Sequence, residues 1–370
     1  MSDSEGSGSE QRARKRPVSR SPSPDGGIKR IAGENSSVVQ SHYNELKESG
    51  LAERSKSRIF HMRNFNNWVK SMFLNEFLGK IKNSQKLGEH LRVLDMCCGK
   101  GGDLLKYEKA QITHLICTDI ADVSIEQCKV RYDQMKGGRK FTAEFIACDS
   151  TLVRLREKYK DPSMKLNLVS CQFAFHYCFE SLSQADCMAR NASECLQPGG
   201  YFIATIPDAN EIMRRQRLAN ENSFGNSVYN IEFCCDTENP PLFGAKYQFH
   251  LEGVVDCPEF LVYFPLLEEL CKKYGLKLVR KTSFADYFHE NKESGKMLLQ
   301  RMNALESYPN KGRPLFGDDS EYEHAKNNKL GNIRTLSKSE WEATSLYLVC
   351  AFQKCKNTWD ANGKPVYEFD

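Results

Sequence analysis

The spacing of apolar residues changes along the chain from a helical period to short, almost continuously apolar runs. Within 38–80 they recur every three or four residues, as at Phe65, Trp68 and Val69, which predicts helices. Farther on, seven apolar runs alternate with helical segments: Leu91–Cys97, His114–Ile120, Glu144–Asp149, Leu166–Phe173, Tyr201–Pro207, Lys277–Phe284 and Tyr347–Lys354. Such runs are typical of strands buried on both faces. The pattern therefore predicts a doubly wound, seven-stranded α/β fold with a parallel sheet and helices on both faces.

Two longer segments interrupt the alternation between the late strands. In the first, about 210–275, Tyr229–Phe233 and Lys246–Leu251 alternate like antiparallel strands, and Glu259–Tyr274 has a helical pattern. The second covers about 285–335. We therefore expect one domain, residues 38–355, that carries two insertions near the carboxyl edge of its sheet.

The two ends of the chain differ from this domain. Residues 1–37 are rich in Ser, Gly and Pro and have few large apolar side chains, so they are predicted to be disordered. They contain a short basic cluster, Arg12–Arg16, which is compatible with a nuclear localisation signal and equally with a solvated charged tail. Residues 356–370 are expected to form a C-terminal tail.

Composition narrows the class of protein. The 370 residues are 40% hydrophobic and 27% charged, with a net charge of +4 that permits a polyanionic partner without requiring one. Because no apolar run has the length of a membrane span and the N-terminus has no apolar signal region, we expect no membrane contact and no secretion. The fifteen cysteines follow no metal-ligand spacing. They predict free, buried thiols in a reducing compartment rather than zinc or disulfides.

A glycine-rich turn between Asp95 and Asp103 follows the first predicted strand. Gly99, Gly101 and Gly102 would let the backbone approach a ligand closely in front of a helix N-terminus. Taken alone, this is weak evidence, because many turns contain glycine without binding anything.

Two acidic residues at the next strand ends strengthen the case for a nucleotide-like cofactor. Asp119 ends the second predicted strand, where a carboxylate can accept hydrogen bonds from both hydroxyls of a ribose, and Asp149 ends the third. Each could instead cap a helix. The dinucleotide pattern GxGxxG is absent, and an acid followed by GxGG suits a cofactor with an ammonium and a sulfonium but no pyrophosphate. These residues favour S-adenosylmethionine over NAD.

Several longer motifs then resemble one family. They are RNFNNWVKS (63–71), DMCCGKGGDLLK, CTDIADVSI, CQFAFHY, SFGN, LEGVVDCPEFLVYF and LSKSEWEATSLYL. All look like the eukaryotic mRNA cap guanine-N7 methyltransferases, and the resemblance covers about residues 38–355. It implies a Rossmann-like class I methyltransferase fold, S-adenosylmethionine as cofactor without a metal, and the 5′ end of nascent GpppN-capped mRNA as substrate.

The resemblance also implies a set of cofactor-binding residues: Lys70, Cys97, Gly99, Asp119, Asp149, Gln172 and Tyr177. Lys70 would pair with the methionine carboxylate. Cys97 stands where the family has the first glycine of its turn, and we expect a thiol to fit there if the backbone keeps a negative φ.

Eight positions are implied in cap binding. Glu259 would accept hydrogen bonds from guanine N1–H and N2–H, His176 would donate to O6, and Tyr347 would stack on the purine. Asn66 and Asn67 would contact the cap nucleotide, and Lys100, Lys106 and Arg131 would lie near the triphosphate. Taken singly, each basic residue is more often part of a solvated helix face.

The expected chemistry requires no acid–base side chain. Guanine N7 carries an exposed lone pair at neutral pH, so catalysis would consist of positioning and electrostatics, with His176, Tyr177 and Glu259 as positioning residues. Three alternatives stay open: a cap-binding module that has lost methyl transfer, a methyltransferase for another base or small molecule, and, more distantly, an NAD oxidoreductase. The resemblance further suggests a nuclear protein, with a small activating subunit and the transcription machinery as partners.

Overall fold

The computed structural model describes residues 34–369, apart from eight short segments. These segments are 47–49, 51–52, 54, 85–88, 136–140, 311–313, 327–332 and 363. The basic cluster Arg12–Arg16 and most of the tail predicted to be disordered lie outside the described residues. Helix α1 (Glu34–Glu45) begins within 1–37, so regular structure starts slightly before the expected domain boundary.

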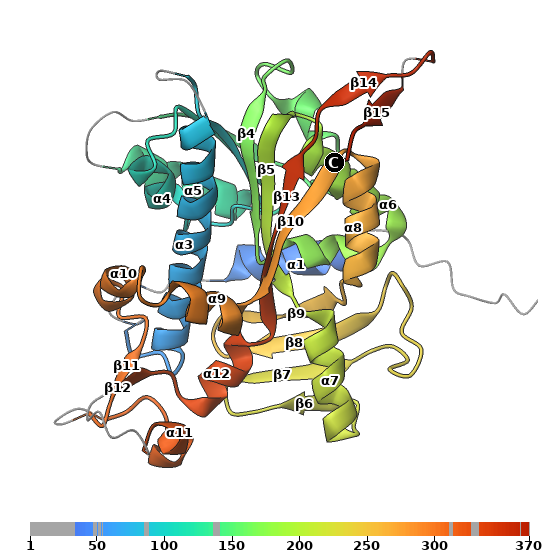
Figure 1. The fold of residues 1–370 in the computed structure, drawn as a ribbon. Coiled ribbons are helices and arrows are strands. Elements are labelled where there is room, and N and C mark those ends of the chain that lie inside the picture. The colour runs from blue at the N-terminus through green and yellow to red at the C-terminus, as the bar shows by residue number, and fades with distance from the viewer. Residues whose placement is uncertain are drawn as a thin grey trace, which may run out of the picture. The chain divides into compact units, whose positions relative to one another are not determined.

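A seven-stranded sheet lies at the centre of the domain (Figure 1). Its strands are β1 (Arg92–Met96), β2 (His114–Asp119), β3 (Thr142–Ala147), β4 (Leu166–Gln172), β5 (Leu196–Pro207), β10 (Leu276–Ser283) and β13 (Tyr347–Lys354). Their order is β10-β13-β5-β4-β1-β2-β3, which confirms the doubly wound prediction. All seven strands coincide with predicted apolar runs.

One edge of the sheet departs from the prediction. Strands β1 to β5 pair in parallel, but β13 runs antiparallel to both β5 and β10, so the sheet is mixed and the expectation of a wholly parallel sheet is wrong there. The apolar pattern could not reveal this, because a strand buried on both faces has the same composition in either direction. Strand β5 also begins earlier than predicted, at Leu196.

Helices pack on both faces of the sheet (Figure 1). Successive side chains of a strand point to opposite faces. Val93 of β1 therefore packs in the hydrophobic core of α3 (Phe60–Ser84), whereas Leu94 packs in the core of α6 (Leu182–Ser193) and α8 (Phe264–Lys273). The remaining helices are α4 (Leu104–Lys109), α5 (Asp122–Asp133), α7 (Ala209–Ala219), α9 (Phe284–Asn291), α10 (Lys296–Arg301), α11 (Glu323–Lys326), α12 (Lys338–Thr344) and the 3₁₀ turns η1 (Leu155–Lys158), η2 (Phe175–Glu180) and η3 (Asp319–Tyr322).

The first insertion forms a second, antiparallel sheet below the central one in Figure 1. Its strands are β6 (Ser223–Gly225), β7 (Tyr229–Phe233), β8 (Lys246–Leu251) and β9 (Val255–Phe260). The antiparallel prediction is confirmed for β7 and β8. The helix predicted from Glu259 is wrong at its start: Glu259 lies on β9 opposite Tyr247, and α8 begins only at Phe264. Pairing with β8 overrides the local helical pattern.

The second insertion and the C-terminal end contain short elements. Strands β11 (Glu306–Tyr308) and β12 (Ile333–Thr335) pair with each other. Within 356–370, expected to be a tail, β14 (Asn357–Trp359) and β15 (Pro365–Tyr367) form a hairpin. Among the described residues, no helix has both the length and the apolar character needed to cross a membrane.

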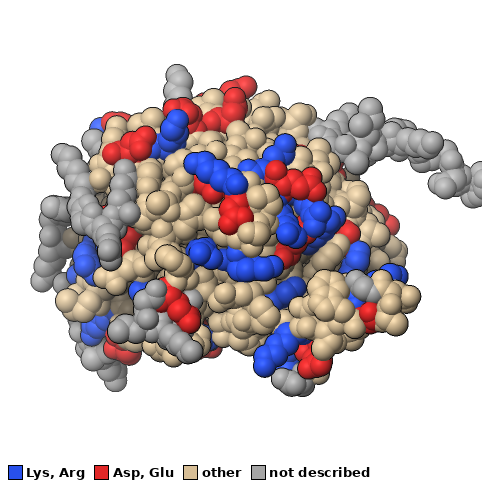
Figure 2. All heavy atoms as spheres, turned by 90° about the horizontal axis from the view of Figure 1, so that it is seen from above, with Lys and Arg blue, Asp and Glu red and all other residues tan. Residues whose placement is uncertain are grey.

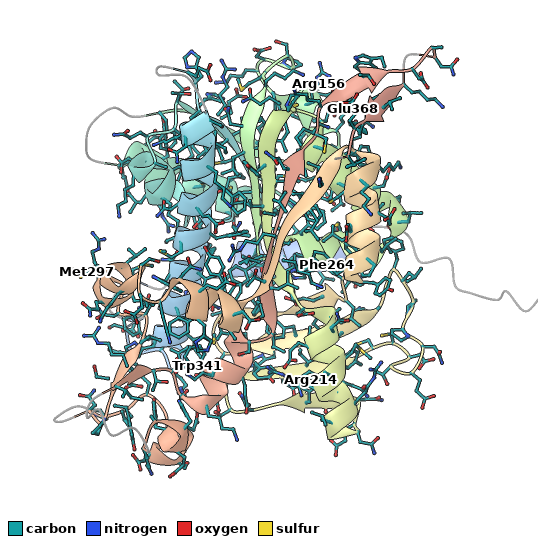
Figure 3. The ribbon with its side chains drawn as sticks, viewed as in Figure 1. Arg156, Arg214, Phe264, Met297, Trp341 and Glu368 are labelled. Carbon is teal, nitrogen blue, oxygen red and sulfur yellow. The ribbon has the colours of Figure 1, made fainter. Side chains whose placement is uncertain are left out.

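An aromatic cluster fixes α3 against the insertions. Trp341 of α12, labelled in Figure 3, lies 5.2 Å from the ring of Phe65 on α3 and 5.4 Å from that of Phe288 on α9. Its indole N–H donates to the hydroxyl of Thr335 at 3.0 Å. These contacts set the position of the α3 segment that carries Asn66, Asn67 and Lys70.

Charges are mixed on the face seen from the top of Figure 1. Lys and Arg side chains lie interspersed with Asp and Glu there (Figure 2). Arg156 and Glu368, both labelled in Figure 3, come from this end of the domain. Positive and negative charges therefore largely offset each other on the face that Figure 2 shows.

Candidate active site

The chain turns sharply after β1 at the carboxyl edge of the sheet. Gly99 has φ +52° and Gly101 has φ +73°, conformations that glycine adopts without steric cost. The N–H of Gly99 donates to Oδ2 of Asp119 at 2.8 Å, and the N–H of Cys98 donates to the carbonyl of Thr118 at 2.9 Å. The glycine-rich turn is therefore fastened to the end of β2.

Cys97 shares the left-handed conformation of this turn. Its φ is +56°, so the condition of a negative φ, under which a thiol was expected to fit, is not met. The chain must reverse directly after Met96, and the residue at this point takes the conformation that a glycine would adopt freely. For a cysteine this costs about 1–2 kcal/mol.

Asp119 is the buried carboxylate at the end of β2. Its Oδ1 accepts from the N–H of Ala121 at 2.9 Å, and its Oδ2 accepts from Gly99. Burial raises the pKa of Asp119 to about 6, although both N–H groups act in the opposite direction. Each carboxylate oxygen has a second lone pair that can accept from a ribose hydroxyl.

Asp149 follows β3, and Gln172 is the last residue of β4. Oδ1 of Asp149 accepts from the N–H and the hydroxyl of Thr151, at 2.8 and 2.6 Å. The amide of Gln172 donates to the Ser170 hydroxyl at 3.0 Å, while its Oε1 is buried without a hydrogen-bond partner. An unsatisfied buried acceptor costs about 1–3 kcal/mol, so this oxygen is suited to receive a donor from a ligand.

Lys70 belongs to a buried network of two lysines and two acids. Its Nζ lies 3.0 Å from Oδ2 of Asp103, and Nζ of Lys106 lies 2.6 Å from Oδ1. Burial alone would raise the pKa of Asp103, but these two ammonium groups outweigh it and lower the pKa to about 2. Burial, together with the charge of Asp103, raises the pKa of Asp95 well above its usual value. An ammonium has three donors, so Lys70 can hold Asp103 and a ligand carboxylate together.

These residues surround a cavity of about 420 Å³ at the carboxyl ends of β1, β2 and β4. All the predicted cofactor residues line it: Lys70, Cys97, Gly99, Asp119, Asp149, Gln172 and Tyr177. The volume lies within the usual range of small-molecule sites. We call this space the first cavity.

A second cavity of about 550 Å³ adjoins the first and shares part of its wall, including Lys70 and Arg131. Six of the eight predicted cap residues line it: Asn66, Asn67, Arg131, His176, Glu259 and Tyr347. The two remaining residues lie elsewhere. Lys100 lines the first cavity and donates to the Leu46 carbonyl at 2.5 Å. Lys106 is held by Asp103 and by Oδ1 of Asn67, at 2.6 Å.

Glu259 and His176 form a buried polar pair in the wall of the second cavity. Their exposed fractions are 3% and 1%, and Nε2 of His176 lies 3.2 Å from Oε1 of Glu259, without the alignment of a hydrogen bond. Oε2 of Glu259 accepts from the Tyr247 hydroxyl at 2.8 Å. One carboxylate oxygen is therefore occupied by the protein, while the other and both ring nitrogens of His176 lack a hydrogen-bond partner.

Aromatic rings shape the same cavity. Tyr347 lies edge-on to Phe173, with ring centres 5.0 Å apart, and both line the second cavity. Phe173 has φ +61°, and its N–H donates to the Thr205 carbonyl at 3.0 Å and hydroxyl at 2.8 Å. These bonds hold a strained residue in the wall that separates the two cavities.

Sequence reasoning missed several residues that line both cavities. Phe173 and Val254 are two of them, and Arg63 is a third. Arg63 begins the RNFNNWVKS motif, a signal that could have identified it. Tyr43 of α1 is the fourth; its hydroxyl lies 3.1 Å from that of Tyr177, and nothing in its local sequence distinguishes it.

Helix α1 supplies Tyr43 because polar side chains hold the helix across the first cavity. Asn35 donates to Glu180 at 2.6 Å, Gln40 to the Ile120 carbonyl at 2.9 Å, and Asn44 to Asp122 at 2.9 Å. The helix thus closes one side of the cavity through hydrogen bonds rather than through a large apolar contact.

Comparison with known proteins identifies the family to which the chain belongs. The profile of the mRNA (guanine-N(7))-methyltransferase domain matches residues 28–355. The mRNA cap guanine-N(7) methyltransferase of Drosophila melanogaster is 63% identical over 349 residues, which cover 91% of this chain and 81% of that protein. The corresponding protein of Caenorhabditis elegans is 41% identical over 357 residues, which cover 90% and 92%. A methyltransferase from Streptomyces caelestis is similar in structure, with a TM-score of 0.44 and 15% identity over 78% of this chain and 88% of that one. Because the profile spans most of the sequence and these relatives match nearly end to end, the chain belongs to the mRNA cap guanine-N7 methyltransferase family.

Proposed function

We propose that this protein transfers a methyl group from S-adenosylmethionine to N7 of the terminal guanine of GpppN-capped nascent mRNA. Family membership supports the reaction. The observation that carries the proposal is a pair of adjoining cavities with a common wall, one at the glycine-rich turn and one around a buried, partly unsatisfied carboxylate. A methyl donor and its acceptor need such adjacent sites.

The residues of the first cavity suit S-adenosylmethionine, which supplies an electrophilic methyl group when bound. Asp119 would hold the ribose hydroxyls, and Lys70 would pair with the methionine carboxylate. The unpartnered Oε1 of Gln172 offers an acceptor for an N–H donor of the ligand. The raised pKa of Asp95 shows that its charged form is disfavoured in the free protein, and a cation bound nearby would stabilise that form.

The second cavity suits guanine. Oε1 of Glu259 lies near His176 but accepts no hydrogen bond from the protein, and guanine N1–H and N2–H are donors that adenine lacks. His176 would donate to O6, which requires a proton on the nitrogen that faces the base. Tyr347 and Phe173 supply apolar surface, and stacking of a base on an aromatic ring contributes about 1–3 kcal/mol.

The chemical step would depend on positioning. Guanine N7 has an available lone pair, so no side chain has to remove a proton, and no metal is needed for methyl transfer. His176, Tyr177 and Glu259 would hold the base with N7 toward the first cavity. Asn66, Asn67 and Arg131 would orient the rest of the cap, while Lys100 and Lys106 would contribute positive charge nearby.

Labelled transfer tests the proposal directly. Purified protein with radiolabelled S-adenosylmethionine and GpppG-ended RNA should yield label on N7 of the terminal guanine. RNA that already carries the N7 methyl is the matched control and should accept none. Folded protein that binds S-adenosylhomocysteine but transfers no label would contradict the proposal.

The partners and location are further parts of the proposal. The basic cluster Arg12–Arg16 and a substrate that is nascent mRNA support nuclear localisation and contact with the transcription machinery. The insertions at about 210–275 and 285–335 offer surface for a small activating subunit. Alanine substitution throughout Arg12–Arg16, followed by imaging of a tagged protein, tests the first point, and co-purification tests the others.

A further inference from the structure

Three thiol groups converge behind the glycine-rich turn. Cys98 lies in the turn, Cys117 on β2 and Cys128 on α5, and their sulfur atoms all lie within 4.8 Å of one another. Cys117 and Cys128 are buried, Cys98 is half-buried, and all three are free thiols. We call these residues the thiol trio.

The dimensions of the thiol trio fit a metal–thiolate centre. A zinc–sulfur bond is about 2.3 Å long, so three sulfurs arranged around one ion in a plane are roughly 4 Å apart. The sulfur atoms of the trio, all within 4.8 Å of one another, are close enough for this arrangement. The three residues come from different elements, so only the fold brings their sulfur atoms together.

The turn itself is shaped to admit the third sulfur. A Cβ atom at Gly101 would lie only 2.7 Å from Sγ of Cys128. Any larger residue at 101 would therefore force the sulfur of Cys128 or the side chain of Leu104 to shift. Gly101 thus serves the trio as well as the left-handed turn, where its φ is +73°.

We propose that Cys98, Cys117 and Cys128 bind one thiophilic divalent ion with a filled d shell, Zn²⁺ or Cd²⁺. Binding replaces three S–H bonds with three metal–sulfur bonds, releases three protons and changes no oxidation state. Thiolate ligands select such ions over Mg²⁺ and Ca²⁺, which prefer oxygen. The site is separate from the methyl-transfer chemistry.

The ion reaches the trio through the first cavity. Cys98 lines that cavity, whereas Cys117 and Cys128 are buried. A ligand in the first cavity therefore shields the only trio member that lines it. This access route, but not the site itself, rests on the proposed binding of S-adenosylmethionine there.

Cadmium titration of the reduced full-length chain tests the site. Thiolate-to-metal charge transfer absorbs in the ultraviolet, and we expect one tight equivalent of Cd²⁺ per chain with this absorption. Cys98→Ser and Cys128→Ser should each remove the tight equivalent. Cys234→Ser changes an exposed cysteine outside the trio and is the matched control, which should titrate like the wild type.

Other outcomes overturn the proposal. The first is a wild-type cadmium titration in both trio variants, with circular dichroism showing that they are folded. The second is a disulfide between trio members, seen in mass spectrometry as the loss of two hydrogens with no metal bound. Saturating S-adenosylhomocysteine should slow cadmium uptake at least tenfold; an unchanged rate with the ligand bound would refute the access route. If S-adenosylhomocysteine does not bind, the proposed function fails, while the titration still decides the site.

Discussion

Glu259→Gln separates reading of the base from binding of the cofactor. Glu259 lines the second cavity but not the first, and its Oε2 accepts from Tyr247 at 2.8 Å. In a glutamine an NH₂ group replaces one of the two carboxylate oxygens, so either the side toward Tyr247 or the side toward guanine loses its acceptor. Loss of one hydrogen bond to a charged group costs about 1.5–3 kcal/mol, which corresponds to a fall of roughly 10- to 150-fold in kcat/KM for capped RNA.

Two measurements on the same preparation check this prediction. Initial rates of N7 methylation at subsaturating capped RNA give kcat/KM, and calorimetry gives the Kd of S-adenosylhomocysteine, which should change by less than about twofold. Tyr247→Phe is the matched control: it keeps the carboxylate and removes only its internal donor, so the loss of kcat/KM should be smaller. Equal losses in kcat/KM and cofactor affinity for Glu259→Gln would refute a guanine-reading role.

Three further predictions concern the turn, its carboxylate and the support of α3. The pKa of Asp119 is raised to about 6, and its ionised form accepts the ribose hydroxyls. The affinity for S-adenosylhomocysteine, measured by calorimetry, should therefore fall about tenfold between pH 7 and pH 5. The same pH dependence in Asp119→Asn would contradict this. Cys97→Gly relieves a left-handed cysteine and should unfold at the same denaturant concentration as the wild type or a higher one, whereas Cys97→Ala keeps the strain and should unfold earlier; the reverse order would show that strain is not the deciding factor. Trp341→Ala removes the half-buried ring that packs against Phe65 and Phe288, and should lower the free energy of unfolding by about 3 kcal/mol. Trp341→Phe keeps an aromatic ring and should lose less. If urea unfolding gave the two variants the same stability as each other, the packing role would be excluded.

The local pattern of apolar residues predicted the strands of the central sheet well, but it predicted the direction of β13 and the elements of the first insertion less well. Each buried run became a strand because its apolar side chains are buried between two helical layers, and right-handed crossovers place those helices on the two faces. The direction of β13 and the strand at Glu259 depend on pairing with distant segments. Composition within a window of ten residues does not record such pairing.

At the candidate site, too, the sequence predicted some residues and missed others. Residues at the carboxyl ends of strands, such as Asp119, could be placed at this edge from the sequence, because a doubly wound sheet binds ligands there. Tyr43 could not, because α1 reaches the cavity through three separate polar contacts with distant residues, at the end of η2, directly after β2 and at the start of α5. The thiol trio also escaped, because its members come from a turn, a strand and a helix and follow no ligand spacing.

The two strained residues explain why the cavities lie where they do. The sheet order reverses between β1 and β4, the point at which a doubly wound sheet opens a crevice. Cys97 follows β1 with φ +56°, and Phe173 follows β4 with φ +61°. Adjacent chains that both turn away in left-handed conformations leave their strand ends uncovered, and each such residue costs about 1–3 kcal/mol that the surroundings must offset. At Phe173 two hydrogen bonds to Thr205 provide that support, and its ring then stands in the wall common to the two cavities. The strain is therefore located where the proposed methyl donor and its acceptor must meet.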